Sequence, residues 1–123
     1  MKIFVAHSSG FDFTTKLYGP LRSSALNTAH EIHLPQEGKV EEITRDIIAA
    51  ADVLLVEVSM PSLGAGIEMG WEDAFDIPII ALYEKGTAVS FSIDNVITDR
   101  IEYKDEADMI KQIEEALSTL ASV

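Results

Sequence analysis

The segment "DVLLVEVSMPSLGAGIEMGWEDAFDIPIIALYE", residues 52–84, decides the fold predicted for this chain. Residues 52–59 and 78–84 are almost entirely apolar, which is typical of strands buried on both faces of a parallel sheet. Residues 66–76, between them, have the character of a helix. A strand, a helix and a second strand in this order predict two parallel strands joined by a helix that packs on the sheet.

The rest of the chain continues this alternation of short apolar runs and amphipathic segments. Apolar residues recur at helical spacing within residues 39–51, and the last predicted helix has an acidic first turn that suits the helix dipole. Pro20 is expected near a kink or an end of the first helix. Residues 89–97 are ambiguous and are predicted as a short helix. The other predicted strands are residues 2–7, 30–35 and 99–103, and the other predicted helices are residues 13–24, 39–51 and 105–120.

Five strands alternating with helices predict an α/β fold, a single domain spanning residues 1–123 with a flavodoxin-like, doubly wound, five-stranded parallel sheet. The length of 123 residues fits one domain, and 47% hydrophobic residues are enough for one core. In such folds ligands bind beyond the carboxyl ends of the strands, where the strand order reverses. The residues that follow each predicted strand are therefore the candidates for function.

The charge and the residue types argue against several classes of function. A formal net charge of −12 disfavours binding to nucleic acid or to an anionic membrane. The absence of cysteine excludes disulfides, thiolate metal sites and cysteine nucleophiles. The N-terminus has no signal-peptide pattern and the apolar runs are too short for a bilayer, so a cytoplasmic protein is expected. Three scattered histidines make a poor metal site, and we expect no metal and no cofactor.

Polar and glycine residues follow the predicted strands. His7 ends the first strand, where it could bind phosphate, protonate a leaving base, or serve as a hydrogen-bonded structural residue. Ser62, Gly64 and Gly66 lie at the start of the helix after the third strand, where free amides and a closely approaching backbone could hold an anion such as phosphate. Similar turns are common in α/β proteins for structural reasons alone, so this pattern leaves both interpretations open.

Glu68 is expected just inside the first turn of the same helix. A glutamate there is favoured by the helix dipole alone, and without further information that explanation is preferred. A glutamate held at the mouth of a cleft can instead attack an electrophilic carbon or accept a proton.

Residues 50–83 resemble the signature segment of the nucleoside 2-deoxyribosyltransferase superfamily, and most closely that of its 2′-deoxynucleoside 5′-phosphate N-hydrolases. The shared pattern is Ala-Asp before a strand, Glu-Val near its end, Pro-Ser-x-Gly-x-Gly, a hydrophobic residue, a glutamate, and a glycine two residues later. In this chain the pattern is carried by Ala51-Asp52, Glu57-Val58, Pro61-Ser62-Leu63-Gly64-Ala65-Gly66, Ile67, Glu68 and Gly70.

The resemblance implies an N-glycosidase of nucleotide metabolism. Glu68 would attack the anomeric carbon of a deoxyribose and displace the base, after which water, or a second base in a transferase, would release the sugar. Ser62 stands where the transferase branch typically has an aspartate, and a serine can donate to a 5′-phosphate that an aspartate would repel. The implied partner is therefore a small nucleotide, a 2′-deoxynucleoside 5′-monophosphate, whose base–sugar bond is hydrolysed.

The resemblance also assigns the remaining site residues. Family members are dimers or larger, so a homo-oligomer, a dimer, is expected. Ser90 resembles a serine that is contributed across the dimer interface, and the group that orients the base after the second strand would be Gln36 or Glu37. The residues implied in holding the phosphate are Ser8, Ser9, Gly10, Ser62 and Gly64, and Gly66 is a further substrate-binding residue.

The chain departs from the family pattern in the loop after the first strand, where Ser9, Phe11 and Asp12 stand in place of an arginine and paired glycines, and at two further positions. Phe4 replaces a strand tyrosine, and Thr44 stands about where a second acidic residue is expected. Asp46, two positions later, is taken as the second catalytic residue, which requires a different helix register. The departures favour an alternative, a nucleotide-binding module that has lost turnover. Base exchange between deoxynucleosides and cleavage of another N-glycoside are further alternatives that use the same glutamate.

Overall fold

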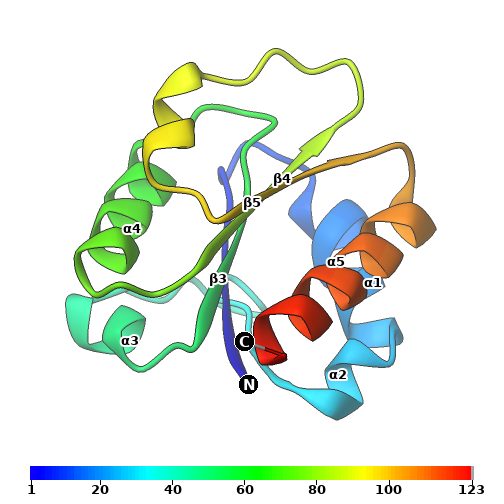
Figure 1. Ribbon diagram of the computed structural model, residues 1–123, viewed down its shortest axis with the longest axis horizontal. Coiled ribbons are helices and arrows are strands. Elements are labelled where there is room, and N and C mark those ends of the chain that lie inside the picture. The colour runs from blue at the N-terminus through cyan, green and yellow to red at the C-terminus, as the bar shows by residue number, and fades with distance from the viewer. Residues whose placement is uncertain (123) are drawn as a thin grey trace.

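The computed structural model describes residues 1–122 as an α/β structure in three layers (Figure 1). Its five strands form one parallel sheet in the order β2-β1-β3-β4-β5. This is the flavodoxin-like order, so the predicted fold class is confirmed. The strands are β1 (Lys2–Ala6), β2 (Glu31–His33), β3 (Val53–Glu57), β4 (Ile79–Glu84) and β5 (Asp99–Tyr103).

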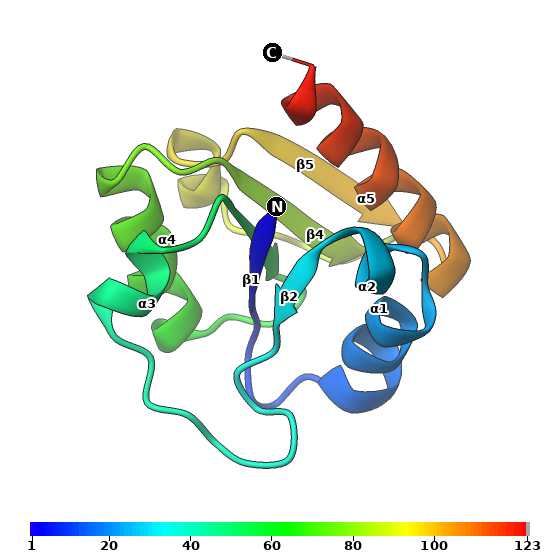
Figure 2. The same cartoon turned by 90° about the horizontal axis from the view of Figure 1, so that it is seen from below.

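Helices cover both faces of the sheet. Figures 1 and 2 show α1, α2 and α5 together on one side and α3 and α4 on the other. The first group comprises η1 (Thr14–Tyr18), α1 (Gly19–Ser23), α2 (Leu26–Ala29) and α5 (Glu106–Ala121). The second comprises α3 (Arg45–Ala49), α4 (Leu63–Ala74) and η2 (Phe91–Asn95).

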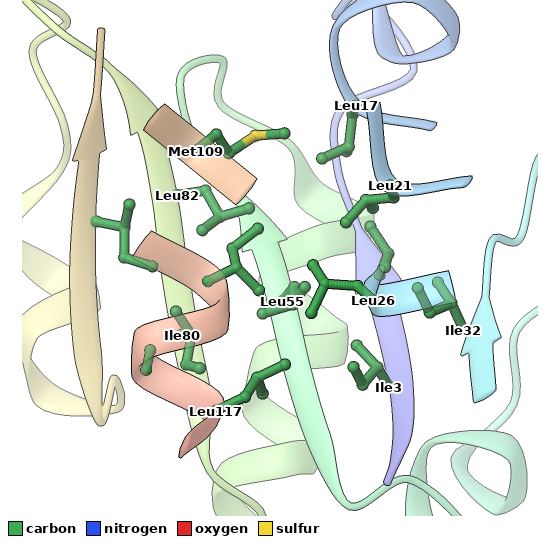
Figure 3. Close-up of a cluster of buried hydrophobic side chains, with 14 of the residues drawn as sticks. Ile3, Leu17, Leu21, Leu26, Ile32, Leu55, Ile80, Leu82, Met109 and Leu117 are labelled. Carbon is green, nitrogen blue, oxygen red and sulfur yellow. The ribbon is translucent and has the colours of Figure 1, made fainter. Parts of the chain in front are cut away.

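Two apolar clusters separate these layers because neighbouring residues of a strand point to opposite faces. Ile3 of β1 joins the cluster beneath α1, α2 and α5, in which Leu55, Leu82 and Met109 are fully buried (Figure 3). Phe4, the next residue, joins the cluster beneath α3 and α4. Each fully buried side chain of this size contributes about 1.5–3 kcal/mol. Packing on both faces therefore fixes the position of the strands, and with it the points from which the loops at the carboxyl edge of the sheet begin.

The predicted helix over residues 39–51 is wrong in its first half. α3 begins only at Arg45, because Thr44 is extended and its hydroxyl accepts a hydrogen bond from the Ile47 amide at 3.5 Å, as an N-cap does. The preceding segment is a loop in which Gly38 has a φ of +80°. The Glu41 amide donates to the Pro35 carbonyl oxygen at 3.1 Å, which folds this loop back over the end of β2.

The other boundaries are closer to the predictions. The predicted helix over residues 13–24 is present as η1 and α1, with Pro20 in the first turn of α1, and α2 is an additional short helix. Residues 99–103 form β5 as predicted, and residues 91–95 form a short 3₁₀ helix. Within residues 1–122, no helix has both the length and the apolar character needed to cross a membrane.

Candidate active site

A cleft of about 200 Å³ opens at the carboxyl end of β1, beside α4. Four of the predicted site residues, His7, Gln36, Gly64 and Glu68, line it together. They come from three parts of the chain, which the parallel sheet brings to the same edge. The remaining lining residues are Ala6, Pro35, Glu41, Ile43 and Trp71.

Ser62 determines where Glu68 lies along α4. The Ser62 hydroxyl accepts a hydrogen bond from the Ala65 amide at 3.2 Å, so Ser62 is the N-cap and the helix begins at Leu63, earlier than the predicted start at residue 66. Gly64 and Gly66 therefore belong to the helix and do not flank its start. Glu68 lies in the second turn, beyond the reach of a helix-dipole explanation, which covers only the first turn.

The Glu68 carboxyl is half-buried on the wall of the cleft. Burial raises the pKa of this group to about 7. No lysine or arginine lines the cleft within residues 1–122, and the Glu68 carboxylate forms no hydrogen bond there. A desolvated carboxylate without a partner is a basic and nucleophilic group, because nothing in its surroundings already stabilises its charge.

His7 is held by both of its ring nitrogens. Nδ1 lies 2.9 Å from the Ser8 carbonyl oxygen, so it carries the proton and donates it. Nε2 lies 2.6 Å from the Tyr18 hydroxyl, which donates to it and accepts from the Gln36 amide at 3.1 Å. Burial lowers the pKa of His7, which keeps the ring neutral. These hydrogen bonds of His7 and Tyr18 stabilise the wall of the cleft. Neither ring nitrogen of His7 is free to protonate a leaving base.

Tyr18 was not identified from the sequence, although it is central to this hydrogen-bonded chain. Burial raises the pKa of Tyr18 to about 12, and the carboxylates of Glu37, Glu68 and Glu41 add to that effect. The hydroxyl therefore stays protonated and remains a donor to His7. Glu41 was also missed, because it fell inside the helix predicted over residues 39–51.

The residues predicted to hold phosphate do not all meet in one place. Ser62 and Ser90 line a second cavity of about 210 Å³, between α4 and the segment that leads into η2. Ser8 is buried, and its hydroxyl accepts from the Gly10 amide at 3.1 Å. Ser9 and Gly10 are exposed, and a Cβ on Gly10 would lie 3.3 Å from the Cε of Met60, so a larger residue there would require the Met60 side chain to move slightly. Gly66 is exposed on α4, and it is not among the described residues that line either cavity.

Asp46 is not brought to the cleft. It is exposed in the first turn of α3, and the Thr44 hydroxyl beside it caps that helix. Phe4 is fully buried with its ring 5.2 Å from that of His33, so a hydroxyl at the family's tyrosine position would be enclosed in the core. The acidic residue that does line the cleft beside Glu68 is Glu41, whose carboxylate lies 2.8 Å from His33 Nε2.

Two buried glutamates differ sharply in their surroundings. Glu57 accepts hydrogen bonds from the Tyr103 hydroxyl and the Ser59 amide. Glu72 is completely buried, and both of its carboxyl oxygens lack a hydrogen-bond partner within residues 1–122. Burial, and then the charge of Glu68, raise the pKa of Glu72 to about 8. Across residues 1–122 there is no group of three or more His, Asp or Glu side chains that could hold a metal ion.

Sequence comparison finds one short and specific match. A curated protein of Syntrophotalea carbinolica, named provisionally as a 2′-deoxynucleoside 5′-phosphate N-hydrolase, is 51% identical over 39 residues, which are 32% of this chain and 28% of that protein. The matched part is therefore less than a third of that protein's length. No protein-family model matches the chain.

Comparison of the folds extends over nearly the whole chain. A CMP N-glycosidase from Clostridium botulinum has a TM-score of 0.69 and 19% identity, with 93% of this chain and 99% of that chain covered. A 2-deoxyribosyltransferase from Bacillus psychrosaccharolyticus has a TM-score of 0.65 and 18% identity, with 89% and 90% covered. The chain shares the fold of the nucleoside deoxyribosyltransferases. Together with the 39-residue sequence match, this likeness of fold confirms the resemblance predicted from residues 50–83.

A third solved structure of this fold gives no functional information. A conserved protein from Enterococcus faecalis V583 has a TM-score of 0.73 and 16% identity, with 94% of this chain and 98% of that chain covered. At identities below 20%, these three likenesses establish the architecture, and the chemistry has to be argued from the site.

Proposed function

We propose that the protein is an N-glycosidase that hydrolyses the base–sugar bond of 2′-deoxynucleoside 5′-monophosphates, with Glu68 as the nucleophile. One observation carries the proposal: Glu68 lies half-buried on the wall of a cleft, and within residues 1–122 neither a cation nor a hydrogen bond stabilises its charge. The signature segment around it and the short match to a provisionally named N-hydrolase support the same chemistry.

In the proposed reaction, a Glu68 carboxylate oxygen attacks the C1′ carbon while the bond from C1′ to the base nitrogen breaks. The electron pair of that bond leaves with the base, and a glycosyl ester forms on Glu68. Water then attacks C1′, which frees the carboxylate and the sugar phosphate. The transition state has oxocarbenium character, and a negative charge on Glu68 would stabilise it.

The cleft offers a second polar group for the base. Gln36 lines the cleft, and its side-chain amide forms no hydrogen bond within residues 1–122, so this amide is available to both donors and acceptors of a base edge. Trp71, on the same helix as Glu68, provides an apolar wall on which a base can stack. Gln36 is therefore our candidate for orienting the base.

The phosphate is assigned to serine hydroxyls and backbone amides. The Ser62 hydroxyl accepts from the Ala65 amide, so its own proton is free to be donated to a phosphate oxygen. Gly64 lines the cleft and Ser62 the cavity on its other side, so the first turn of α4 would lie against the ribose and phosphate. In this proposal Ser90, which lines the same cavity as Ser62, and the loop residues Ser8, Ser9 and Gly10 are also assigned to the phosphate end. Gly66, which lines neither cavity within residues 1–122, and Asp46 have no assigned step.

The decisive experiment is base release from a panel of deoxynucleosides and their 5′-monophosphates. We expect the monophosphates to be hydrolysed, and Glu68→Gln to lower kcat by at least about 1,000-fold, because the amide cannot form the ester. Glu115→Gln, which changes an exposed glutamate of α5, is the matched control and should retain full activity. Base release by Glu68→Gln at the parental rate would refute the nucleophile assignment.

Base exchange is the second candidate, because the same ester could be attacked by a second base. The likeness of fold to a 2-deoxyribosyltransferase keeps it open. Adding a second free base to the assay separates the two: a new nucleoside indicates transfer, and free sugar alone indicates hydrolysis. A nucleotide that binds without any release of base would instead support the non-catalytic alternative.

We also propose a cytoplasmic homodimer that acts on free nucleotides and not on nucleic acid. The net charge of −12 supports the exclusion of polyanions. Leu63 and Ile67 on α4 and the nearby Met60 have exposed fractions of 83%, 47% and 42%, which supports a covered face on α4. Light scattering at several concentrations tests the dimer, and a monomer at all of them would exclude it.

A further inference from the structure

Glu72 stands apart from the other buried polar side chains of the protein. Four polar or charged residues among residues 1–122 are buried, namely His7, Ser8, Glu57 and Glu72. The first three are hydrogen-bonded, whereas neither carboxyl oxygen of Glu72 has a hydrogen-bond partner in the part of the chain that the structure describes. An ionised carboxylate in such a place would be very costly, so Glu72 has to be neutral while it stays buried.

The position of Glu72 relates it directly to the proposed nucleophile. It lies four residues after Glu68 on α4, and residues with this spacing are neighbours on one helix face. Glu68 is half-buried and faces the cleft, whereas Glu72 is enclosed one turn further along. Two carboxyls so close cannot both ionise easily, and the more exposed one loses its proton first.

The charged and titratable groups on the surrounding elements do not stabilise a negative charge on Glu68 or Glu72. On α3, Arg45 and Asp46 are exposed. On β3, Glu57 is already bonded to Tyr103 and Ser59. Around the cleft stand neutral His7 and the carboxylate of Glu41, and the part of β4 beneath the helix is apolar. No lysine or arginine is buried within residues 1–122.

We infer that Glu72 is a positioning residue that stays protonated next to Glu68 and thereby keeps the single negative charge of the pair on the nucleophile. The inference rests on the proposed function of Glu68. Ionisation of Glu72 would bring a second charge into the apolar layer beneath α4, and the helix would have to shift to hydrate it. Because Glu68 is on the same helix, that shift would displace the attacking oxygen from the cleft.

The inference predicts an upper pH limit for base release, which is tested with Glu72→Gln and Glu72→Met. In the parent, kcat/KM should fall about tenfold per pH unit above about pH 8, as expected when one group ionises. Both variants lack the ionisable group, so their kcat/KM should stay within about twofold over the same range. A role in packing alone would lower activity at every pH and leave the alkaline fall in place. Persistence of the fall in a folded variant, or its absence from the parent, would overturn the inference.

A direct titration separates this inference from the proposed function. The carboxyl carbons of 13C-labelled glutamate report each protonation by NMR. We expect one resonance that titrates near pH 8 in the parent and in Glu115→Gln, and that is missing from Glu72→Gln. If the parent releases base but shows no such resonance, the inference is refuted and the proposed function is unaffected. The resonance without any base release would sink the proposed function, and Glu72 would remain a buried acid without a catalytic role.

Discussion

His7, Tyr18 and Gln36 form a chain of hydrogen bonds in which each donor is fixed by its neighbours. The Ser8 carbonyl oxygen can only accept and the Gln36 amide can only donate, so Tyr18 must pass its own proton toward His7. The ring of Phe13 stacks on His7 at 4.4 Å and shields this arrangement. At this edge of the cleft, the side chains serve as a rigid wall and not as proton donors to a substrate.

The first prediction concerns this wall. Tyr18→Phe leaves the Gln36 amide and His7 Nε2 without partners, and we expect it to lower the free energy of unfolding by about 1–3 kcal/mol. Tyr83→Phe is the matched control, because the Tyr83 hydroxyl forms no hydrogen bond within residues 1–122. Urea denaturation of both variants measures the difference. Equal stability of the two would mean that water replaces the Tyr18 hydroxyl without loss.

The sequence predicted the nucleophile candidate but not all the residues around it. Glu68 was found because the signature segment fixes many spacings at once. Glu72 was missed because a glutamate among charged residues is normally expected on a solvated helix face. A signal was available: Glu72 lies seven residues after Ala65, so both belong to the face of α4 that packs on the sheet. Tyr18 could not have been found, since its partners are distant in the sequence.

At the scale of elements, α4 combines a capping residue with a candidate substrate residue in Ser62. Both roles use the same hydroxyl, which accepts from the Ala65 amide and retains a proton to donate. A simple deletion of the hydroxyl would therefore confuse loss of the helix cap with loss of phosphate binding. A substitution that keeps the cap and changes the charge separates them.

Ser62→Asp is that substitution. Aspartate is as good an N-cap as serine and suits the helix dipole, so the free energy of unfolding should change by less than about 0.5 kcal/mol. Its charge should repel a 5′-phosphate, and we expect KM for deoxynucleoside monophosphates to rise at least about tenfold with little change for deoxynucleosides. Ser62→Ala, which should cost about 1 kcal/mol, is the companion variant. An unchanged KM for the monophosphates would remove Ser62 from the substrate site.

Strands were predicted more accurately than helices, for a physical reason. β3 and β4 are short, mainly apolar runs that each end in a glutamate, and such runs are typical of strands buried on both faces. A helix begins after a capping residue such as Thr44 or Ser62. The hydroxyl of such a residue can bond the backbone in a helix cap or in a turn, and the sequence alone does not show which of the two forms. Because the residues around Gly38 form a loop, α3 begins later than predicted. Asp46, the second acidic residue expected at the site, is exposed in its first turn and does not line the cleft.

At the scale of the whole molecule, buried carboxyl groups make stability depend on pH. Burial raises the pKa values of Glu57, Glu68 and Glu72 above their ordinary value of 4.5, so the folded state binds more protons than the unfolded state. The free energy of unfolding therefore falls as the pH rises from 4.5 toward the raised values. His7 and His30, whose pKa values are lowered, act in the opposite direction only below about 6.5.

Between about pH 6.5 and pH 8 only the carboxyl effect remains. We expect the free energy of unfolding to fall there by up to about 1.4 kcal/mol per pH unit for each group that ionises. Denaturant titrations at several pH values measure this slope. Glu72→Gln should reduce it and Glu115→Gln should not. A parent whose stability is constant or rises over this interval would show that these carboxyls are not desolvated.

The overall charge affects how a substrate reaches the cleft. A net charge of −12 repels a nucleoside monophosphate at long range, and salt screens this repulsion over a Debye length of about 10 Å at 0.1 M. We expect kcat/KM for a deoxynucleoside monophosphate to rise severalfold when salt is increased from about 0.01 M to about 0.2 M. The same increase should leave an uncharged deoxynucleoside unaffected. A fall with salt for the monophosphate would point to cations at the site.

The bond between Tyr18 and His7 gives the protein a built-in reporter. A hydroxyl proton that is enclosed and shared with an imidazole nitrogen at 2.6 Å exchanges slowly with water, whereas most tyrosine hydroxyl protons are exchanged too fast to observe. It should therefore give its own proton resonance, shifted far downfield. Because His7 lines the cleft, the chemical shift of this resonance should change when a nucleotide binds, before the base–sugar bond is cleaved.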